Sequence, residues 1–194
     1  MRIENSFIPI QGVGETTERR LWEAGVTHWE EFDGAVVGPK TTDRIHSFLD
    51  VATDPLRRGD ARFFDESFPP GERWRLYENF RDDALFFDIE TTGLDAARND
   101  VTTVSCYRGG TVETFVRGDD LTADALRGRF ADAPLIVSFN GARFDVPFLE
   151  RSFDLSVDAP HLDLMYPCRR LDLTGGLKRI EADVDIDRDR PDLS

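Results

Sequence analysis

A short apolar stretch that carries two acids, residues 84–94, constrains the fold more than any other part of the sequence. Side chains alternate between the faces of a β-strand, so Asp88 and Glu90 would share one face, with Cα atoms roughly 7 Å apart. Two carboxylates on an otherwise apolar strand are costly unless a cation lies between them. Such oxygen ligands suit hard divalent ions such as Mg²⁺. The stretch therefore predicts a metal site at the end of a buried strand.

The length of 194 residues suits one ordinary domain and a small second one, and 40% hydrophobic residues predict a folded chain. No apolar run of about 18 residues is present, so we expect no membrane span. The N-terminus lacks the apolar segment of a signal peptide, which favours a cytoplasmic protein. Cys106 and Cys168 have no CxxC spacing and are expected to be packing residues.

The charge pattern is unusual, with a net charge of −14 and only Lys40 and Lys178 as lysines among 24 basic residues. This composition is typical of the proteins of salt-accumulating halophiles. Molar salt shortens the Debye length to about 3 Å and screens acidic self-repulsion. The acidity therefore leaves a nucleic-acid partner open, and an acidic protein that avoids nucleic acid is the alternative.

Residues 1–53 are expected to form a small all-α domain, in which two glycine turns, Gly-Val-Gly and Val-Gly-Pro-Lys, each open a helix. A short helix capped by Thr27 is expected between them, and the second long helix is expected to reach Leu49. The pair of turns resembles tandem helix-hairpin-helix elements, whose main-chain N–H groups bind DNA phosphates. The resemblance would assign phosphate contacts to Gly12, Gly14, Gly38 and Lys40. A protein-interaction module or spacer is the alternative, because Glu15 follows the first turn and basic residues are sparse.

Residues 54–82 are predicted to be a connector with one helix, over residues 72–80. Its aromatic side chains, Trp74 among them, are expected to pack on the second domain, with stacking on bases as the alternative. From residue 83 to residue 194 the predicted order is three strands, a helix, a strand, a helix and a strand. This is the order of an α/β, ribonuclease H-like fold, in which three antiparallel strands are followed by parallel additions to a mixed sheet.

The boundaries expected in this second domain follow turn and cap signals. A Gly109-Gly110 turn joins two strands, and Thr122 caps a helix. The remaining expected elements are a strand at 134–139, a helix from 144, a strand at 161–165, a helix at 177–181 and a poorly ordered acidic tail from 183.

Two motifs make a resemblance specific. The stretch Phe-Asp-Ile-Glu-Thr-Thr-Gly-Leu at 87–94 resembles the first motif of the DnaQ-like, or DEDD, 3′–5′ exonucleases. The stretch Ser-Phe-Asn-Gly-Ala-Arg-Phe-Asp at 138–145 resembles the second. The segments His-Leu-Asp-Leu at 161–164 and Gly-Gly-Leu-Lys at 175–178 are similar to the YprB-like branch.

The resemblance implies hydrolysis of phosphodiesters at the 3′ end of DNA or RNA with two divalent metal ions, Mg²⁺ or Mn²⁺. It assigns metal binding and catalysis to Asp88, which would bridge both ions, to Glu90 and to Asp145. It assigns substrate contacts and supporting roles to Thr91, Thr92, Asn140, Asp163 and His161.

The third motif of that family, a Tyr or His followed by an Asp on a C-terminal helix, has no counterpart after Gly176. Alternating acids at 183, 185, 187 and 189 are interpreted as a solvated run. We therefore expect either a truncated chain or a decayed copy, with a rate lower by orders of magnitude. A non-catalytic nucleic-acid-binding or adaptor protein with the same fold is the alternative, and an acidic interaction protein unrelated to nucleic acid is a third.

Overall fold

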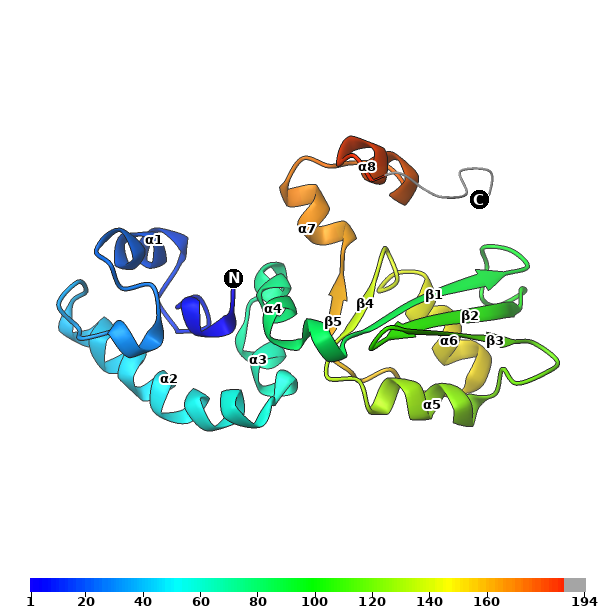
Figure 1. Ribbon diagram of the computed structural model, residues 1–194, viewed down its shortest axis with the longest axis horizontal. Helices are drawn as coiled ribbons and strands as arrows, with labels where there is room; N and C mark the ends of the chain where they lie inside the picture. Colours follow the sequence, from blue (N-terminus) through cyan, green and yellow to red (C-terminus); the bar gives the residue numbers. More distant parts are fainter. Residues whose placement is uncertain (187–194) are drawn as a thin grey trace.

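The computed structural model describes residues 1–186, with helices in the first half of the chain and a five-stranded mixed sheet in the second (Figure 1). The sheet has the order β3-β2-β1-β4-β5, in which β1 pairs antiparallel with β2 and parallel with β4. The β2–β3 pair is antiparallel and the β4–β5 pair is parallel. The strands are β1 Leu85–Thr91, β2 Val101–Arg108, β3 Thr111–Val116, β4 Ile136–Ser138 and β5 His161–Asp163. The expected α/β, ribonuclease H-like sheet is confirmed.

The antiparallel half of the sheet follows from local turn chemistry. Gly109 and Gly110 both have positive φ, 56° and 84°, which the tight hairpin between β2 and β3 requires and which glycine adopts without strain. The β1–β2 register sets Asp88 opposite Ser105 and Glu90 opposite Thr103. The register then shifts between Glu90 and Thr91, so β1 leaves its regular pairing just after the second acid.

In the described part of the chain, four helices accompany the strands: α5 Ala123–Ala131, α6 Asp145–Phe153, α7 Met165–Arg170 and α8 Leu177–Asp183. The Thr122 side chain caps α5 by accepting a hydrogen bond from the N–H of Ala125, as expected. Strand β5 ends at Asp163, and α7 begins at Met165 where more strand was expected. This part of the prediction was wrong because a six-residue helix leaves too short a period to recognise.

The N-terminal half is helical almost throughout. Its elements are η1 Ile3–Asn5, α1 Glu15–Glu23, η2 Trp29–Glu31, α2 Pro39–Arg58, α3 Ala61–Ser67, η3 Pro70–Leu76, α4 Tyr77–Phe80 and η4 Arg81–Asp83. The cap of η2 is His28 and not Thr27, because Thr27 instead donates to the Glu31 carboxylate. Helix α2 passes the expected end at Leu49 and stops at Gly59, whose φ of 70° gives a left-handed C-cap. In addition to η4, the connector contains the helical segments α3, η3 and α4, of which α3 was not expected.

Two hydrophobic cores lie on opposite faces of the sheet. Helices α5 and α6 cover one face, where Leu85, Phe87 and Ile89 of β1 are buried. The other core gathers the N-terminal helices against Val137 of β4 and Leu162 of β5. The helical half therefore covers the parallel end of the sheet and shares its core.

A buried network of charges ties the helical half to α7. Arg75 of η3 pairs with Glu18 of α1 at 3.0 Å and with Glu72 at 2.7 Å, and all three side chains are almost fully buried. Arg170 of α7 contacts the same Glu72 and also pairs with Glu15 at 2.9 Å. Each buried charge has an opposite partner, which buried charges need. The network fixes α7 to α1 and η3.

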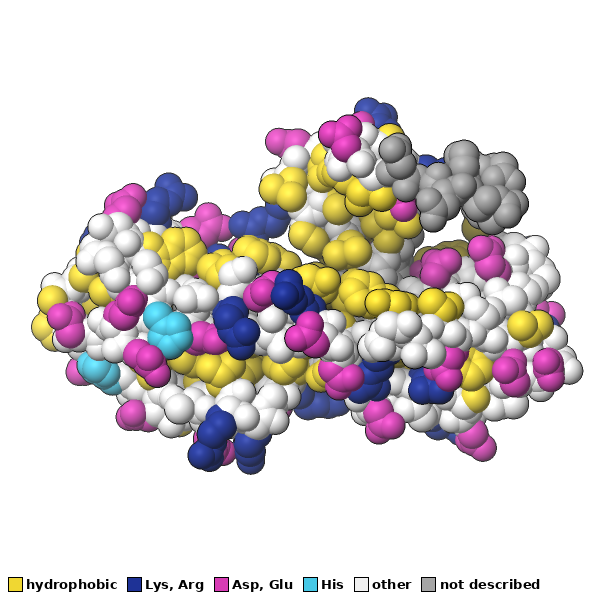
Figure 2. All heavy atoms as spheres, in the orientation of Figure 1, with side chains coloured by type: hydrophobic (Ala, Val, Ile, Leu, Met, Phe, Trp, Pro, Cys, Tyr) yellow, Lys and Arg dark blue, Asp and Glu magenta, His cyan; other side chains and the backbone are white. Residues whose placement is uncertain are grey.

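The antiparallel part of the sheet exposes its second face. Tyr107, Val112 and Val116 lie there with large exposed areas, and α7 and α8 add further exposed apolar side chains. Figure 2 shows hydrophobic side chains gathered on the α7–α8 segment and over the strands beneath it. Within residues 1–186, no helix is both long and apolar enough to cross a membrane. The tail was expected to lose order from residue 183, but Asp183 is the last residue of α8, so this boundary was wrong. The acids at 187 and 189 lie outside the described residues.

Candidate active site

The two acids of the first motif lie on the exposed face of β1, toward its carboxyl end. Asp88 and Glu90 are both exposed. Phe87, which precedes Asp88, and Ile89, which lies between the two acids, are buried against α5 and α6. The alternation of β1 therefore separates an apolar face from an acidic one, as expected from the sequence.

The acid of the second motif meets β1 through a main-chain contact. Asp145 is the first residue of α6 and is only 5% exposed. Its Oδ1 accepts a hydrogen bond of 3.2 Å from the N–H of Ile89, the residue between Asp88 and Glu90. Because β4 runs parallel to β1, the loop after β4 returns α6 to the same end of the sheet. The structure thus brings the acids of both motifs together.

The charges of these acids repel one another. Burial, followed by the charge of Asp88, raises the pKa of Asp145 to about 6. Partial desolvation on the sheet surface, followed by the charge of Glu90, raises the pKa of Asp88. Both shifts disfavour the ionised forms, so a cation beside these side chains would be favourable.

A different role is visible for Asp163, at the end of β5. Its buried carboxylate accepts hydrogen bonds from the N–H groups of Asn140 at 2.7 Å, Ala142 at 3.1 Å and Met165 at 3.0 Å. Asn140 has a left-handed φ of 63°, a strained conformation that these bonds hold in place. Asp163 therefore fixes the loop that leads to Asp145.

His161 supports the same loop from β5. Its Nε2 lies 2.8 Å from Oγ of Ser138, and burial lowers the pKa of the imidazole. A Cβ added at Gly141 would lie 2.2 Å from Oγ of Ser138 and 3.3 Å from Oδ2 of Asp145. Glycine is thus required where the loop passes between these two side chains. The motif contains Ser138 and Gly141, but only the tertiary packing reveals their roles.

The turn after β1 is closed by its own hydrogen bonds. The Thr91 hydroxyl donates to the carbonyl of Gly93 at 2.8 Å, and the Thr92 hydroxyl accepts from the N–H of Asp100 at 3.0 Å. The Asn99 side chain lies where a Cβ on Gly93 would stand. Thr91 and Thr92 therefore shape the turn beside the acids, which is where a substrate contact was expected.

The donor chemistry of the site fits a hard divalent cation. Asp88, Glu90 and Asp145 offer only carboxylate oxygens, from two elements, and a cation would oppose the raised pKa values of Asp88 and Asp145. Across residues 1–186, no three His, Cys, Asp or Glu side chains are already grouped closely enough to form a metal site. The acids are thus near one another without forming a closed set of ligands.

The predicted phosphate contacts lie in the N-terminal helices, far from the acids in the sequence. Gly14 and Gly38 are the N-cap residues of α1 and α2, as the glycine-turn pattern predicts, and Lys40 is exposed in the first turn of α2. At Gly12 a Cβ would clash with the guanidinium of Arg44, which donates to the carbonyl of Gln11. The first turn is followed by the Glu15–Arg170 ion pair, which places a carboxylate beside it.

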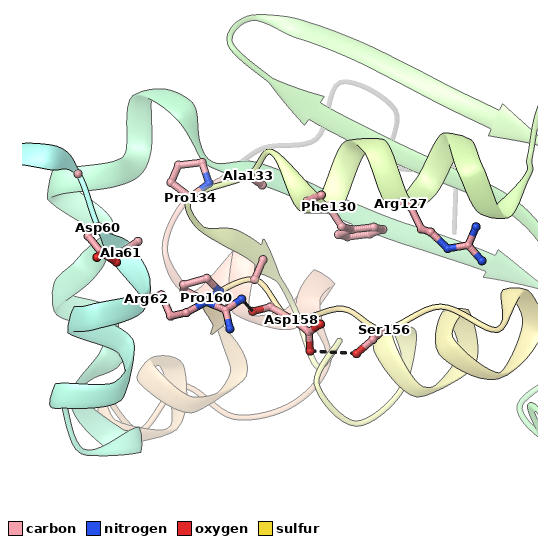
Figure 3. Close-up of a pocket in the computed structure, with 13 residues that line it drawn as sticks. Asp60, Ala61, Arg62, Arg127, Phe130, Ala133, Pro134, Ser156, Asp158 and Pro160 are labelled. Carbon is pink, nitrogen blue, oxygen red and sulfur yellow. Dashed lines mark hydrogen bonds between the residues drawn. The ribbon is translucent and has the colours of Figure 1, made fainter. Parts of the chain in front are cut away.

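A cavity of about 520 Å³ between α3, α5 and the segment before β5 is separate from these acids (Figure 3). Its own acids have local partners: Asp60 caps α3 through the N–H of Phe63, and Asp158 accepts from the Ser156 hydroxyl. None of the residues that line it belongs to the predicted site. The cavity therefore offers no second set of acids for catalysis.

The sheet order and the placement of the acids at the end of β1 define a ribonuclease H-like α/β domain. A family model described as the RNase_H superfamily matches residues 85–194, more than half of the chain. The chain belongs to the ribonuclease H superfamily.

Several solved structures are similar. One, described as the apo form of the nuclease, is 24% identical with a TM-score of 0.45, over 56% of this chain and 55% of that one. Brucella melitensis NrnC with bound Mg²⁺ is 22% identical with a TM-score of 0.45, over 58% of each chain. The family B DNA polymerase from Pyrobaculum calidifontis is 21% identical with a TM-score of 0.45, over 54% of this chain and 18% of that one. The chain thus spans little more than half the length of the nucleases. No curated protein sequence matches it.

Proposed function

We propose that this protein is a metal-dependent nuclease of the DnaQ-like 3′–5′ exonuclease type, which removes nucleotides from a DNA or RNA end with two divalent ions. One observation carries the proposal: the N–H of Ile89 binds Asp145 beside Asp88 and Glu90. Membership in the ribonuclease H superfamily supports it. A sheet protein without such chemistry has no need for three acids at one strand end, two of them with raised pKa values.

Asp88, Glu90 and Asp145 would hold the metal. Bound there, divalent ions would neutralise charge on the phosphate oxygens and lower the pKa of a water molecule. Asp163 and Ser138 keep the loop in place, so that Asp145 is presented to β1 without reorganisation. The exposed Thr92 and the half-buried Asn140 flank the acids, where they would contact the terminal nucleotide.

A non-catalytic nucleic-acid-binding or adaptor protein is the second candidate. It is favoured by Asp163, whose carboxylate is occupied by three N–H donors and is therefore a poor fourth metal ligand. It is also favoured by the absence, within residues 1–186, of three acids already grouped for a metal. In this case Asp88 and Glu90 would remain in the sequence although the protein hydrolyses no nucleic acid.

The nuclease proposal is tested with short single-stranded DNA and RNA labelled at either end, incubated with Mg²⁺ or Mn²⁺ in dilute and in molar salt. We expect stepwise shortening from the 3′ end. Asp88→Asn should lower the rate by more than about 100-fold, beyond the effect typical of a supporting residue. The matched control is Asp43→Asn, an exposed acid on α2, which should leave the rate unchanged.

Calorimetric titration with Mn²⁺ distinguishes the two candidates. The nuclease is supported if the unaltered protein binds Mn²⁺ and hydrolyses the labelled strand, and if both properties are lost in Asp88→Asn and in Asp145→Asn. Metal-independent binding of nucleic acid, without turnover of any labelled end, would leave the adaptor as the function.

A further inference from the structure

We propose that the cavity between η3, β5 and α7 is a stacking subsite for one nucleobase of a single-stranded nucleic acid, with Trp74 and Tyr166 as its aromatic walls. The cavity has a volume of about 400 Å³, which suits a small planar ligand. The identity of this ligand rests on the proposed nuclease function. The subsite lies partly on η3, outside the region that the superfamily match covers.

Aromatic and apolar surface dominates the wall of the cavity. Tyr166 on α7 is 47% exposed, and the half-buried ring of Trp74 lines the cavity from η3. The guanidinium carbon of Arg75 lies 4.9 Å from the centroid of the Trp74 ring. Because Arg75 is itself held by Glu18 and Glu72, the Trp74 ring is supported by a fixed neighbour. A rigid, accessible aromatic ring of this kind is suited to stacking on a base.

The cavity adjoins the candidate active site through a single loop. Ala142 and Asp163 both line it, and Asp163 accepts a hydrogen bond from the N–H of Ala142. On the other side of the loop, a Cβ on Gly141 would lie 3.3 Å from Oδ2 of Asp145. A strand of nucleic acid bound at the acids could therefore place a neighbouring base in the cavity.

Among the described residues that line the cavity, Arg73 is the one with a cationic side chain. Its Nε lies 3.1 Å from Oδ1 of Asp65, its ion-pair partner among the described residues. A guanidinium in the wall of an aromatic pocket matches a base with its attached phosphate. Because a base in a duplex is already stacked and paired, the subsite selects single strands.

The test measures binding of a fluorescent single-stranded hexanucleotide by anisotropy, with Ca²⁺ in place of Mg²⁺, and scans one abasic nucleotide along it. We expect the abasic site to weaken binding roughly 5- to 100-fold at one or two adjacent positions in the unaltered protein. In Trp74→Ala the same abasic substitution should have no further effect, because the stacking partner is already missing. Trp74→Phe should restore the dependence on the base.

The matched control is Tyr107→Ala, which removes an aromatic ring of similar exposure, 45%, outside the cavity. It should leave the abasic effect intact. Three results would overturn the subsite. The abasic nucleotide could have no position-dependent effect on binding, its effect could add to that of Trp74→Ala, or the hexanucleotide could fail to bind.

The subsite and the nuclease activity can fail separately. Base-dependent binding through Trp74 without hydrolysis in Mg²⁺ would retain the subsite and remove the nuclease. Hydrolysis in Mg²⁺, with binding that does not depend on the position of the abasic nucleotide, would retain the nuclease and remove the subsite.

Discussion

The main-chain N–H of Ile89 donates a hydrogen bond of 3.2 Å to Oδ1 of Asp145, and this bond joins the first residue of α6 to the centre of β1. It holds a nearly buried carboxylate beside Asp88, whose charge helps to raise the pKa of Asp145 to about 6. Above that pH, the folded protein without metal carries an unfavourable negative charge at this point.

The first prediction concerns stability and pH. The folded pKa of Asp145, about 6, lies above the unfolded value of about 3.9, so the folded state binds more protons in between. The contribution of this group is therefore fully present below about pH 4 and is lost as the pH rises through about 6. At pH 8 in EDTA, the free energy of unfolding of Asp145→Asn, measured with urea, should be about 2 to 3 kcal/mol higher than that of the unaltered protein. At pH 4 the two proteins should have similar free energies of unfolding. Equal stability at pH 8 would contradict the raised pKa.

The second prediction concerns Gly141, the glycine in the loop between β4 and α6. Gly141→Ala should destabilise the protein by about 1 to 3 kcal/mol, because its Cβ would lie 2.2 Å from Oγ of Ser138. Removing that hydroxyl with Ser138→Ala should recover part of the loss in the double variant, measured by urea unfolding. Gly128→Ala is the control: it lies within α5 with open space around it and should stabilise by up to about 1 kcal/mol. Strictly additive losses at Gly141 and Ser138 would argue against the clash.

The third prediction separates Asp163 from the proposed metal ligands. Asp163→Asn keeps an oxygen acceptor but removes the charge that binds three N–H groups, so it should cost about 2 kcal/mol of stability. The rate of the proposed nuclease reaction should fall roughly 10- to 100-fold through displacement of the Asp145 loop. Calorimetry should show that Mn²⁺ binding survives, whereas Asp88→Asn abolishes it. Equal loss of metal binding in both variants would make Asp163 a ligand.

The fourth prediction concerns the buried charges that join α1 to η3. Arg75→Met should destabilise the protein by about 3 to 5 kcal/mol, because Glu18 and Glu72 would lose a buried partner. The control is Arg57→Met on the exposed end of α2, whose ion pair with Asp54 should contribute less than about 1 kcal/mol. Urea unfolding of both variants at neutral pH measures the difference. Similar losses would show that the buried network has no special weight.

The parts of the fold that local chemistry decides could be predicted from the sequence. Alternation at Leu85, Phe87 and Ile89 predicts β1, and a Thr122 side chain that can accept an N–H predicts the start of α5. The long α2 could not be bounded in this way. Pro55 suggests an end, yet the helix continues to Gly59, where the left-handed cap stops it.

The acids of the candidate site were recognisable from their motifs, but the contacts that position them were not. Ser138 meets His161 across 23 residues of sequence, and the N–H of Ile89 meets Asp145 across 56. Helix α7 was missed because its six residues leave too short a period, and the contact that places it, from Arg170 to Glu72, reaches far back in the chain. These relationships depend on which segments the sheet brings together, and no local pattern encodes them.

The hydrophobic core shared by the N-terminal helices, Val137 and Leu162 has a consequence for how the chain can be divided. Similarity to the superfamily begins at Leu85, but the folding unit extends to the first residues, since Ile3 and Phe7 belong to the same core. A chain cut at the homology boundary would expose apolar surface on β4 and β5 to water and should aggregate. The superfamily match and the hydrophobic core thus have different boundaries in this molecule, and moving its N-terminal helices to another protein would require moving β4 and β5 with them.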